Sequence, residues 1–506
     1  MSETKRSTWG SSATFILAAV GSAVGLGNAW RFPNLAAKHG GGAFLLVYLL
    51  AMLIIGIPLL MMEISIGRKM KSGAPGALRK MNKKFEPIGW AATSNAFVIV
   101  TYYAVVFAWV IMMAVFSFKF FSMTGNNEAA GGLFQELTKT TFDIKGFDVI
   151  SIPVLACLLV AWASVYYCIR NGTKSVEKII KYLIFLPFLC LGFMAIKGIT
   201  MPGALEGIRA FFVPNFHALA NPELWTDAVG QVFYSMSVVM AIMIAYGSYL
   251  SNDTNIARDG FIIAFSDLAV SLLSGIVMFT TMYGTGMQDM LAQKSGVSLA
   301  FLVYPTAIVN LSGSGVFNAI FGFVFYFCLC TLAIDSAFSL VEGISTAVAD
   351  KFSVDRKKTT IAICVIAGII SLVYTTGGGL AILDIVDNWC NSFTLILVGV
   401  IESVAIGWFY KTGIIVDEIN TNSKRVKMPK IWFDIAIKVV APVSLSVLFV
   451  WNIINLFTKQ NGVYGYNLVS NILAGWVIFG LCMISGFIIN VIYKKIQAKK
   501  DIKDKD

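Results

Sequence analysis

The sequence predicts an all-α, polytopic membrane protein with about twelve transmembrane helices. Of its 506 residues, 57% are hydrophobic and only 13% are charged, and the mean hydropathy is +0.76. Soluble globular domains carry about 45–50% apolar residues and about 25% charged ones. Apolar runs of about twenty residues, the length that spans a bilayer, recur along the chain. We therefore expect the lipid bilayer to surround most of the protein.

Twelve apolar runs are predicted to cross the membrane as helices, because a helix satisfies its backbone hydrogen bonds without water. They are 12–37, 41–68, 88–122, 149–169, 177–197, 225–250, 259–288, 317–349, 358–376, 383–410, 432–457 and 466–493. Polar interruptions in the first and sixth runs have the spacing of two inverted repeats of five helices. The expected parts are a first repeat over 1–200, a second over 201–412, and helices eleven and twelve with the tail over 413–506.

The basic residues predict the orientation of the chain. Lys5 and Arg6 precede the first crossing, and the connection after the second is basic from Arg68 to Lys84. Positive charge marks cytoplasmic loops, so both termini are expected in the cytoplasm, with the chain crossing the plasma (inner) membrane many times. The net charge of +11 is then a topology signal, and no nucleic-acid partner is expected.

The sequence offers no carrier for enzymatic chemistry. It lacks a phosphate-binding Walker loop, a GxSxG elbow and an HExxH pair. The eight cysteines lie mostly in apolar runs and have no metal-ligand spacing with His39 or His217. The cysteines are interpreted as packing residues, so no disulfide framework is predicted. Because the catalytic motifs are absent, the protein is not expected to be an enzyme.

The first crossing is expected to be broken near its middle, in the stretch SAVGLGNAWRFP (22–33). Gly21, Gly25 and Gly27 are residues that a helix interior avoids. A break in hydrocarbon survives only where it is buried in protein or lines a polar cavity. Freed carbonyls there can bind a cation and freed amides a carboxylate, with Asn28 adding a side-chain oxygen. The alternative is that the glycines only allow close helix packing.

The sixth crossing carries uncharged polar groups at mid-membrane, in the stretch GQVFYSMSVVM (230–240). Gln231, Tyr234, Ser235 and Ser237 could form the second half of the same site, or they could satisfy one another across helices. The run SMSVVM has no glycine, which weakens the expectation of a second break.

Three acids lie deep in apolar runs: Glu63, Asp267 and Asp335. A buried ionisable group in a membrane is costly, so each is a functional hypothesis. Asp335 is followed by Ser336, and hard oxygen ligands of this kind suit small cations.

Several motifs together resemble the neurotransmitter:sodium symporters, a family that includes bacterial amino-acid transporters. The motifs are GSAVGLGNAWRFP, GGGAFLLVYLL with GIPLLMME, AVGQVFYSMS, and LAIDSAFSLVEGISTAVADKF. The resemblance covers crossings one to ten. It implies a sodium-coupled secondary active symporter that imports its substrate by alternating access, with two sodium ions.

The resemblance also implies where the ions and the substrate bind. Sodium 1 would be held by Ala23, Asn28, Ser235 and Asp267 together with the substrate carboxylate, and sodium 2 by Gly21, Val24, Leu332, Asp335 and Ser336. The implied substrate-binding residues are Ala23, Leu26, Gly27, Ile99, Tyr103, Tyr234, Ser235, Ser237, Met240, Ser336 and Leu340. The implied outer gate is Arg31 with Asp387 over Tyr234, and the implied inner gate is Arg6 with Asp350, next to Trp9, Ser248 and Tyr249.

Departures from the family pattern refine the expected substrate and ions. Members that carry amines place an aspartate where this chain has Gly25, so we expect a substrate with its own carboxylate, an amino acid. Asp267 replaces a usual asparagine, beside residues that match chloride ligands, namely Tyr48, Gln231, Ser235 and Ser271. A carboxylate there would repel chloride, so transport is expected to be independent of chloride, with protonation of Asp267 as a further hypothesis. Val239 and Met240 replace glycine and phenylalanine of a relative, which suits a neutral, mostly hydrophobic side chain.

Other functions stay open at this point. A sodium- or proton-coupled carrier of a cationic amino acid or another small zwitterion would use the same fold. A channel would need a continuous polar pore, which the scattered acids do not provide. A structural or receptor-like membrane protein would leave Asn28, Asp267 and Asp335 unexplained. The oligomeric state and the role of helices eleven and twelve are not predicted.

Overall fold

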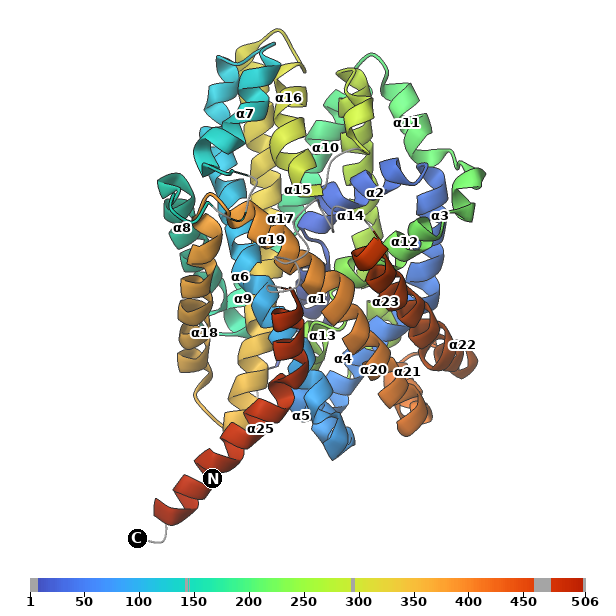
Figure 1. The fold of residues 1–506 in the computed structure, drawn as a ribbon. Helices are drawn as coiled ribbons and strands as arrows, with labels where there is room; N and C mark the ends of the chain where they lie inside the picture. Colours follow the sequence, from blue (N-terminus) through green and yellow to red (C-terminus); the bar gives the residue numbers. More distant parts are fainter. Residues whose placement is uncertain (1–7, 142–143, 145, 293–295, 459–474, 504–506) are drawn as a thin grey trace.

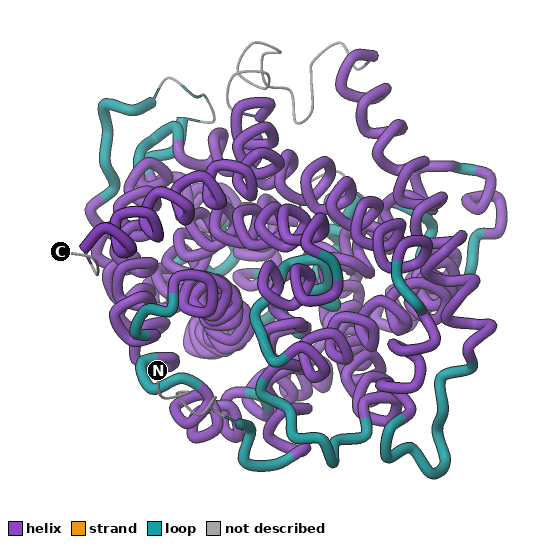
Figure 2. The backbone as a smooth tube through the Cα atoms, turned by 90° about the horizontal axis from the view of Figure 1, so that it is seen from below, coloured by secondary structure: helices purple, strands orange, loops and turns teal. Residues whose placement is uncertain are grey.

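The protein is a bundle of helices in its computed structural model, which describes residues 8–141, 144, 146–292, 296–458 and 475–503. Figure 1 shows long helices running from one side of the bundle to the other, and Figure 2 shows the same helices from below. In these residues the only β contacts are isolated bridges, Gly41 with Pro214 and Ile150 with Thr376. The predicted all-α class is confirmed.

The first part of the chain contains α-helices and short 3-10 or π segments (η). They are α1 (Ser12–Ala23), η1 (Gly27–Arg31), α2 (Phe32–Lys38), α3 (Gly42–Ala51), η2 (Met52–Gly56), α4 (Ile57–Met70), α5 (Ala74–Met81), η3 (Lys83–Phe85), α6 (Glu86–Phe116), η4 (Ser117–Phe121), α7 (Asn127–Thr138), α8 (Ile152–Ile169), α9 (Thr173–Leu183) and α10 (Phe185–Ile199).

The rest of the chain continues in the same way. Its elements are α11 (Ala204–Phe212), η5 (Phe216–Ala220), α12 (Pro222–Ser235), α13 (Ile242–Ser248), α14 (Ile256–Gly284), η6 (Gln288–Met290), α15 (Gly296–Ser298), η7 (Leu299–Val303), α16 (Tyr304–Val309), α17 (Gly315–Phe352), α18 (Arg356–Ser371), η8 (Leu372–Thr375), α19 (Gly379–Trp389), η9 (Cys390–Thr394), α20 (Leu395–Phe409), α21 (Thr412–Asn420), α22 (Lys430–Ile435), η10 (Ala436–Val440), α23 (Ala441–Thr458) and α25 (Val477–Lys503).

Eleven of the twelve predicted crossings correspond to apolar spans among the described residues, although 466–474, the start of the predicted twelfth crossing, lie outside them. Ten helices are long and apolar enough to span a membrane, and the bent pair of Ser12–Ala23 and Gly27–Lys38 makes an eleventh. The predicted crossing 225–250 consists of two shorter helices, α12 and α13, with a non-helical stretch between them. Asn221 caps α12 by accepting from the Glu223 N–H, and Pro222 suits the first turn because it needs no donor there.

The ends of several helices are linked by polar contacts on one side of the bundle, the lower side in Figure 1. The Gly73 N–H after α4 donates to the Asp350 carboxylate near the end of α17, and Lys351 pairs with Glu86 at the start of α6. We call this the basic side, because the residues that gather there include Arg68, Lys69, Lys71, Arg79 and Lys80. The far side of the bundle is called the opposite side.

Candidate functional site

The first crossing is broken where the sequence predicts it. α1 ends at Ala23, Val24 is extended, and the helix resumes at Gly27, with the two halves bent by 53°. A Cβ at Gly25 would lie 2.7 Å from the Ser336 Oγ, and one at Gly27 would lie 2.4 Å from the Tyr234 ring. The glycines therefore let the break approach α12 and α17 closely, in the interior of the bundle.

The sixth crossing is broken too, although its central run has no glycine. Ser237, Val239 and Ala241 have φ angles of 52°, 63° and 62°. This left-handed conformation costs a non-glycine residue about 1–2 kcal/mol. Buried hydrogen bonds hold it: the Ser237 Oγ donates to the Ser22 carbonyl at 2.9 Å, and the Val239 N–H donates to the Glu63 carboxylate at 2.5 Å. Glu63 thus supports the second break, and the Ser237 bond joins the two breaks.

The side chains predicted for sodium 1 lie together around Asp267. Asn28 Nδ2 donates to the Ser235 Oγ at 2.9 Å, to Asp267 Oδ1 at 2.7 Å and to the Ser271 Oγ at 2.8 Å. The Ser235 hydroxyl donates to the Asp267 carboxylate at 2.7 and 2.8 Å, and the Tyr48 hydroxyl donates to it at 3.2 Å. All of these side chains are buried. The cluster is thus one carboxylate surrounded by neutral polar groups.

The residues predicted for sodium 2 meet where α17 passes the end of α1. Asp335 is 3% exposed, and its Oδ1 has no hydrogen-bond partner in the described part of the chain. Its Oδ2 would lie 2.8 Å from a Cβ at Gly21. The Ser336 Oγ lies 3.4 Å from the Ser22 carbonyl and 3.5 Å from the Leu332 carbonyl.

This arrangement fits a sodium ion. A buried carboxylate oxygen without a partner is costly, and a small cation that also binds nearby carbonyls removes that cost. Across the described ranges, no group of three or more His, Cys, Asp or Glu residues could hold a metal ion. At Asp335 the candidate site offers carbonyl and hydroxyl oxygens around one carboxylate. At Asp267 it is the amide nitrogen of Asn28 that faces the carboxylate, while Asn28 Oδ1 accepts from the Gly25 N–H at 2.9 Å. The ions that the two sites bind stay a prediction.

A small pocket of about 30 Å³ lies between the two breaks, α6 and α17. Every predicted substrate-binding residue except Leu26 lines it, and no charged side chain does. The Tyr103 hydroxyl is buried there without a hydrogen-bond partner among the described residues. Ser22 and Ile242 also line the pocket, and sequence reasoning missed both. Ile242 could have been found only by knowing that α13 begins there.

A larger cavity of about 450 Å³ lies on the opposite side and reaches the same pocket wall. Leu26, Tyr103 and Tyr234 line it, as do the predicted outer-gate residues Arg31 and Asp387. The Arg31 guanidinium lies over the Tyr234 ring, 5.1 Å from its centroid. The Asp387 carboxylate accepts hydrogen bonds from the Tyr102 hydroxyl at 2.7 Å and from Asn391 Nδ2 at 2.8 Å. The two charges thus flank the tyrosine that separates the pocket from the cavity.

The basic side of the pocket is filled by the start of the chain. The Trp9 indole N–H donates to the Tyr246 carbonyl at 3.0 Å, and its backbone N–H donates to the Tyr249 carbonyl at 3.0 Å. Its ring meets the Tyr246 and Tyr249 rings edge-on. Ser248 lies between these tyrosines at the end of α13. Arg6 is outside the described residues, so its pairing with Asp350 stays a prediction.

Sequence reasoning missed a buried ion pair next to Trp9 and Tyr249. Glu342 on α17 is 2% exposed, pairs with Arg356 at the start of α18, and accepts a hydrogen bond from the Tyr249 hydroxyl at 2.9 Å. Glu342 lies in an apolar run, as do the three acids that were singled out, so the same signal could have found it.

Comparison with known proteins agrees with the motifs. The sodium:neurotransmitter symporter family matches residues 6–127 and 123–498. A sodium-dependent transporter of Methanocaldococcus jannaschii is 33% identical over 514 aligned residues, which cover 99% of this chain and 100% of that protein. The human sodium- and chloride-dependent GABA transporter 2 is 30% identical over 80% of this chain and 73% of its own length.

A solved structure shares the fold. The crystal structure of MhsT in complex with L-phenylalanine superposes with a TM-score of 0.76 at 28% sequence identity. The match covers 88% of this chain and 99% of that one.

Proposed function

The chain belongs to the sodium:neurotransmitter symporter family, and we propose that this sodium-dependent, multi-pass membrane transporter imports a neutral, mostly hydrophobic amino acid together with sodium. The observation that carries the proposal is the pocket between the two broken helices. It has no charged lining residue, yet it is flanked by the Asp335 carboxylate and by the cluster around Asp267. Broken helices around a site at the membrane midplane are the usual way in which secondary transporters bind ions and substrate together.

The pocket wall suits the two ends of an amino acid. The unpartnered Tyr103 hydroxyl can donate to a carboxylate. The amides of Leu26 and Gly27, where the helix resumes, are of the kind that have no partner within a helix. Ile99, Met240 and Leu340 supply an apolar surface for the side chain. Because no acidic or basic side chain lines the pocket, a charged side chain would enter without a partner.

Two sodium ions are proposed, one at each cluster. The first would lie near Ala23, Asn28, Ser235 and Asp267 and touch the substrate carboxylate. The second would lie between the end of α1 and Asp335. A sodium ion that touches the substrate raises the affinity of the protein for the substrate. By the same factor, the substrate raises the affinity of the protein for sodium, and this couples the transport of the two.

Chloride is not required in this proposal. The Tyr48 and Ser235 hydroxyls, which could donate to a chloride ion, already donate to Asp267. A fixed carboxylate among these donors supplies the negative charge that chloride would bring, and it repels a second anion.

The proposed transport cycle is alternating access. The opposite-side cavity reaches Tyr234, while Trp9 fills the basic side. The positive-inside rule assigns the basic side to the cytoplasm, so the cavity would open outward and both termini would be cytoplasmic in a cell membrane. The first two parts of the chain, 1–200 and 201–412, would be the inverted repeats whose interface holds the site.

Uptake into proteoliposomes tests this proposal. Each of the twenty amino acids is offered with an inward sodium gradient, with potassium in place of sodium, and with gluconate in place of chloride. L-phenylalanine is tested first, since it occupies a structurally similar protein. We expect sodium-dependent uptake of neutral amino acids that persists in gluconate. Uptake that is equal in potassium, or confined to cationic amino acids, would contradict the proposal.

A further inference from the structure

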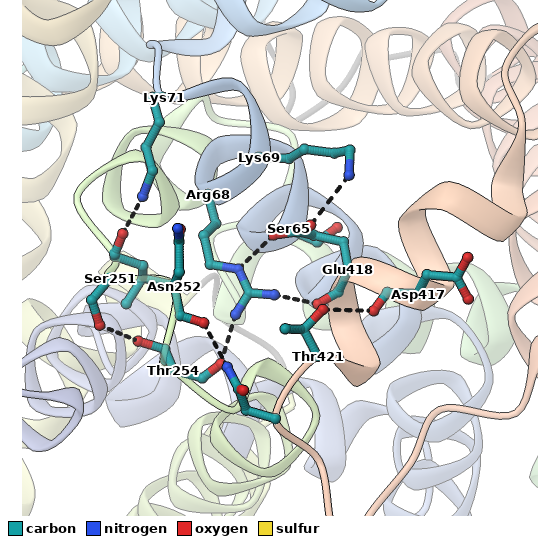
Figure 3. Close-up of polar contacts among 12 residues, drawn as sticks. Ser65, Arg68, Lys69, Lys71, Ser251, Asn252, Thr254, Asp417, Glu418 and Thr421 are labelled. Carbon is teal, nitrogen blue, oxygen red and sulfur yellow. Dashed lines mark hydrogen bonds and ion pairs between the residues drawn. The ribbon is translucent and has the colours of Figure 1, made fainter.

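A buried arginine on the basic side joins three segments that are distant in the sequence (Figure 3). Arg68, in the last turn of α4, is 1% exposed. Its Nη1 donates to the Thr254 carbonyl at 2.6 Å, and its Nε donates to Glu418 Oε1 at 2.7 Å. Its Nη2 donates to the Glu418 backbone carbonyl. Each nitrogen of the guanidinium thus holds either the loop between α13 and α14 or the helix α21.

Further polar contacts tie the same three segments together. Lys69 pairs with Glu418 at 3.3 Å, and Lys71 donates to the Leu250 carbonyl directly after α13. The loop and the residues after α21 also bond to each other, because Asn422 Nδ2 donates to the Asn252 carbonyl at 2.5 Å. Loss of one contact would leave the segments joined, but Arg68 is the group that touches all three.

α13 is attached to α4 differently from the way it is attached to α17. A Cβ at Gly67 would lie 2.0 Å from the Ile244 carbonyl oxygen, and one at Gly247 would lie 2.3 Å from the Ile64 carbonyl oxygen. The two backbones are therefore in direct contact, with no side chain between them. Toward α17, the polar links at the end of α13 are side-chain hydroxyls: Tyr246 bonds to the Ser339 Oγ at 2.7 Å, and Tyr249, directly after α13, bonds to Glu342 and to Thr346.

We infer that α21 moves with α4 and α13 when the basic side of the pocket opens, and that Arg68 is the positioning residue that carries α21 with them. The inference rests on the proposed alternating access. Opening must separate α13 from some neighbour. Separating α13 from α17 replaces hydrogen bonds between hydroxyl groups and protein by hydrogen bonds to water. Separating α21 from α4 would leave the buried Arg68 guanidinium without its carboxylate partner, which costs far more free energy.

Distances between spin labels in nanodisc-embedded protein test the shared movement. Labels are attached through genetically encoded residues at the exposed positions Asp253, Asp417 and Lys357, which leaves the eight native cysteines in place. The probe is sodium, compared with potassium at the same ionic strength. We expect the Asp253–Lys357 and Asp417–Lys357 distances to shift together by several ångströms while the Asp253–Asp417 distance stays constant.

The two ways to fail are distinguishable. If the Asp253–Lys357 distance shifts and the Asp417–Lys357 distance does not, α21 is not part of the moving unit, and the inference is wrong while alternating access stands. If neither distance responds to sodium, both the inference and the proposed cycle are contradicted.

Variants test the role of Arg68 itself. In Arg68→Gln and in Glu418→Gln, the label at Asp417 should follow the label at Asp253 less closely, because the buried ion pair is lost while the Asn422–Asn252 hydrogen bond remains. Arg68→Lys should retain more of the coupling because it keeps the charge. Arg79→Gln is the matched control, since Arg79 is half exposed and pairs with Glu86. Per folded molecule, Arg68→Gln should lower the maximal uptake rate without changing half-saturating sodium. Full coupling in both Gln variants would overturn the assignment.

Discussion

Gly21 offers the sharpest test of the second sodium site. A Cβ at this position would lie 2.8 Å from Asp335 Oδ2 and 2.8 Å from the Ile180 Cδ1. Both distances are shorter than van der Waals contact, so Gly21→Ala must displace the carboxylate, the isoleucine or the end of α1. Overpacking of a tight interior costs about 1–3 kcal/mol.

The size of the expected effect follows from where that cost appears. If the Asp335 carboxylate, which is proposed to hold sodium, is the group displaced, the cost falls on sodium binding. Each 1.4 kcal/mol corresponds to about a tenfold change in affinity, so half-saturating sodium should rise by about 5- to 140-fold. The assay is the sodium dependence of uptake in proteoliposomes, using the amino acid that the uptake screen identifies, with thermal unfolding measured in parallel.

A second glycine provides the control. Gly230 lies in α12, and a Cβ there would meet nothing within 4 Å. Gly230→Ala should leave the sodium dependence unchanged, because alanine is compatible with the helix. A folded Gly21→Ala protein with the sodium dependence of the wild type, together with an unchanged sodium dependence in Asp335→Asn, would refute the placement of an ion between α1 and Asp335.

Three more substitutions test other parts of the site. Asp267→Asn removes the carboxylate to which Tyr48 and Ser235 donate, so uptake should become stimulated by chloride; equal uptake in chloride and gluconate would contradict this role. Tyr103→Phe removes the hydroxyl that is proposed to donate to the substrate carboxylate. A hydrogen bond to a charged group is worth about 1.5–3 kcal/mol, so amino-acid affinity in a competition assay should fall about 10- to 150-fold, and an unchanged affinity would exclude that contact. Glu63→Ala leaves the buried Val239 N–H without an acceptor and should destabilise the protein by about 1–3 kcal/mol, measured by thermal unfolding. Glu63→Gln keeps an acceptor, so its stability should be closer to that of the wild type. Equal stability of all three proteins would contradict the role of Glu63 in supporting the second break.

The first break could be predicted from the sequence because its cause is local. Gly25 and Gly27 stand where a helix would need side-chain packing, and the space they leave is taken by Ser336 and Tyr234. Asp335 could be singled out for a similar reason, since a carboxylate in an apolar run has few roles other than binding a cation or a polar partner.

The second break depends on residues that are distant in the sequence. The run SMSVVM adopts left-handed conformations without glycine because Glu63 and Ser22 hold it from other helices. Nothing local to 236–241 indicates this, so the polar residues gave the position of the break but not its cause. Glu63 was expected to be functional, and its observed contact is with the backbone of that break.

The basic-side connections could not be predicted at all. Arg68 and Glu418 are 350 residues apart in the sequence, and Arg68 reads as one of many cytoplasmic positive charges until its burial is known. An arginine at the cytoplasmic end of a membrane helix can be an exposed topology signal or a buried positioning residue, and the sequence is the same in both cases. Only the packing of α4 against α13 and α21 distinguishes them.

Equilibrium binding of radioactive sodium to the purified protein, counted per folded molecule, tests the central claim most directly. With a saturating amino acid present, and sodium at a concentration that just saturates the wild type, we expect two sodium ions in the wild type and in Gly230→Ala, and one in Asp335→Asn. Sodium binding no greater than in the presence of excess potassium, or two ions retained in Asp335→Asn, would contradict an ion cage formed by the first break and Asp335.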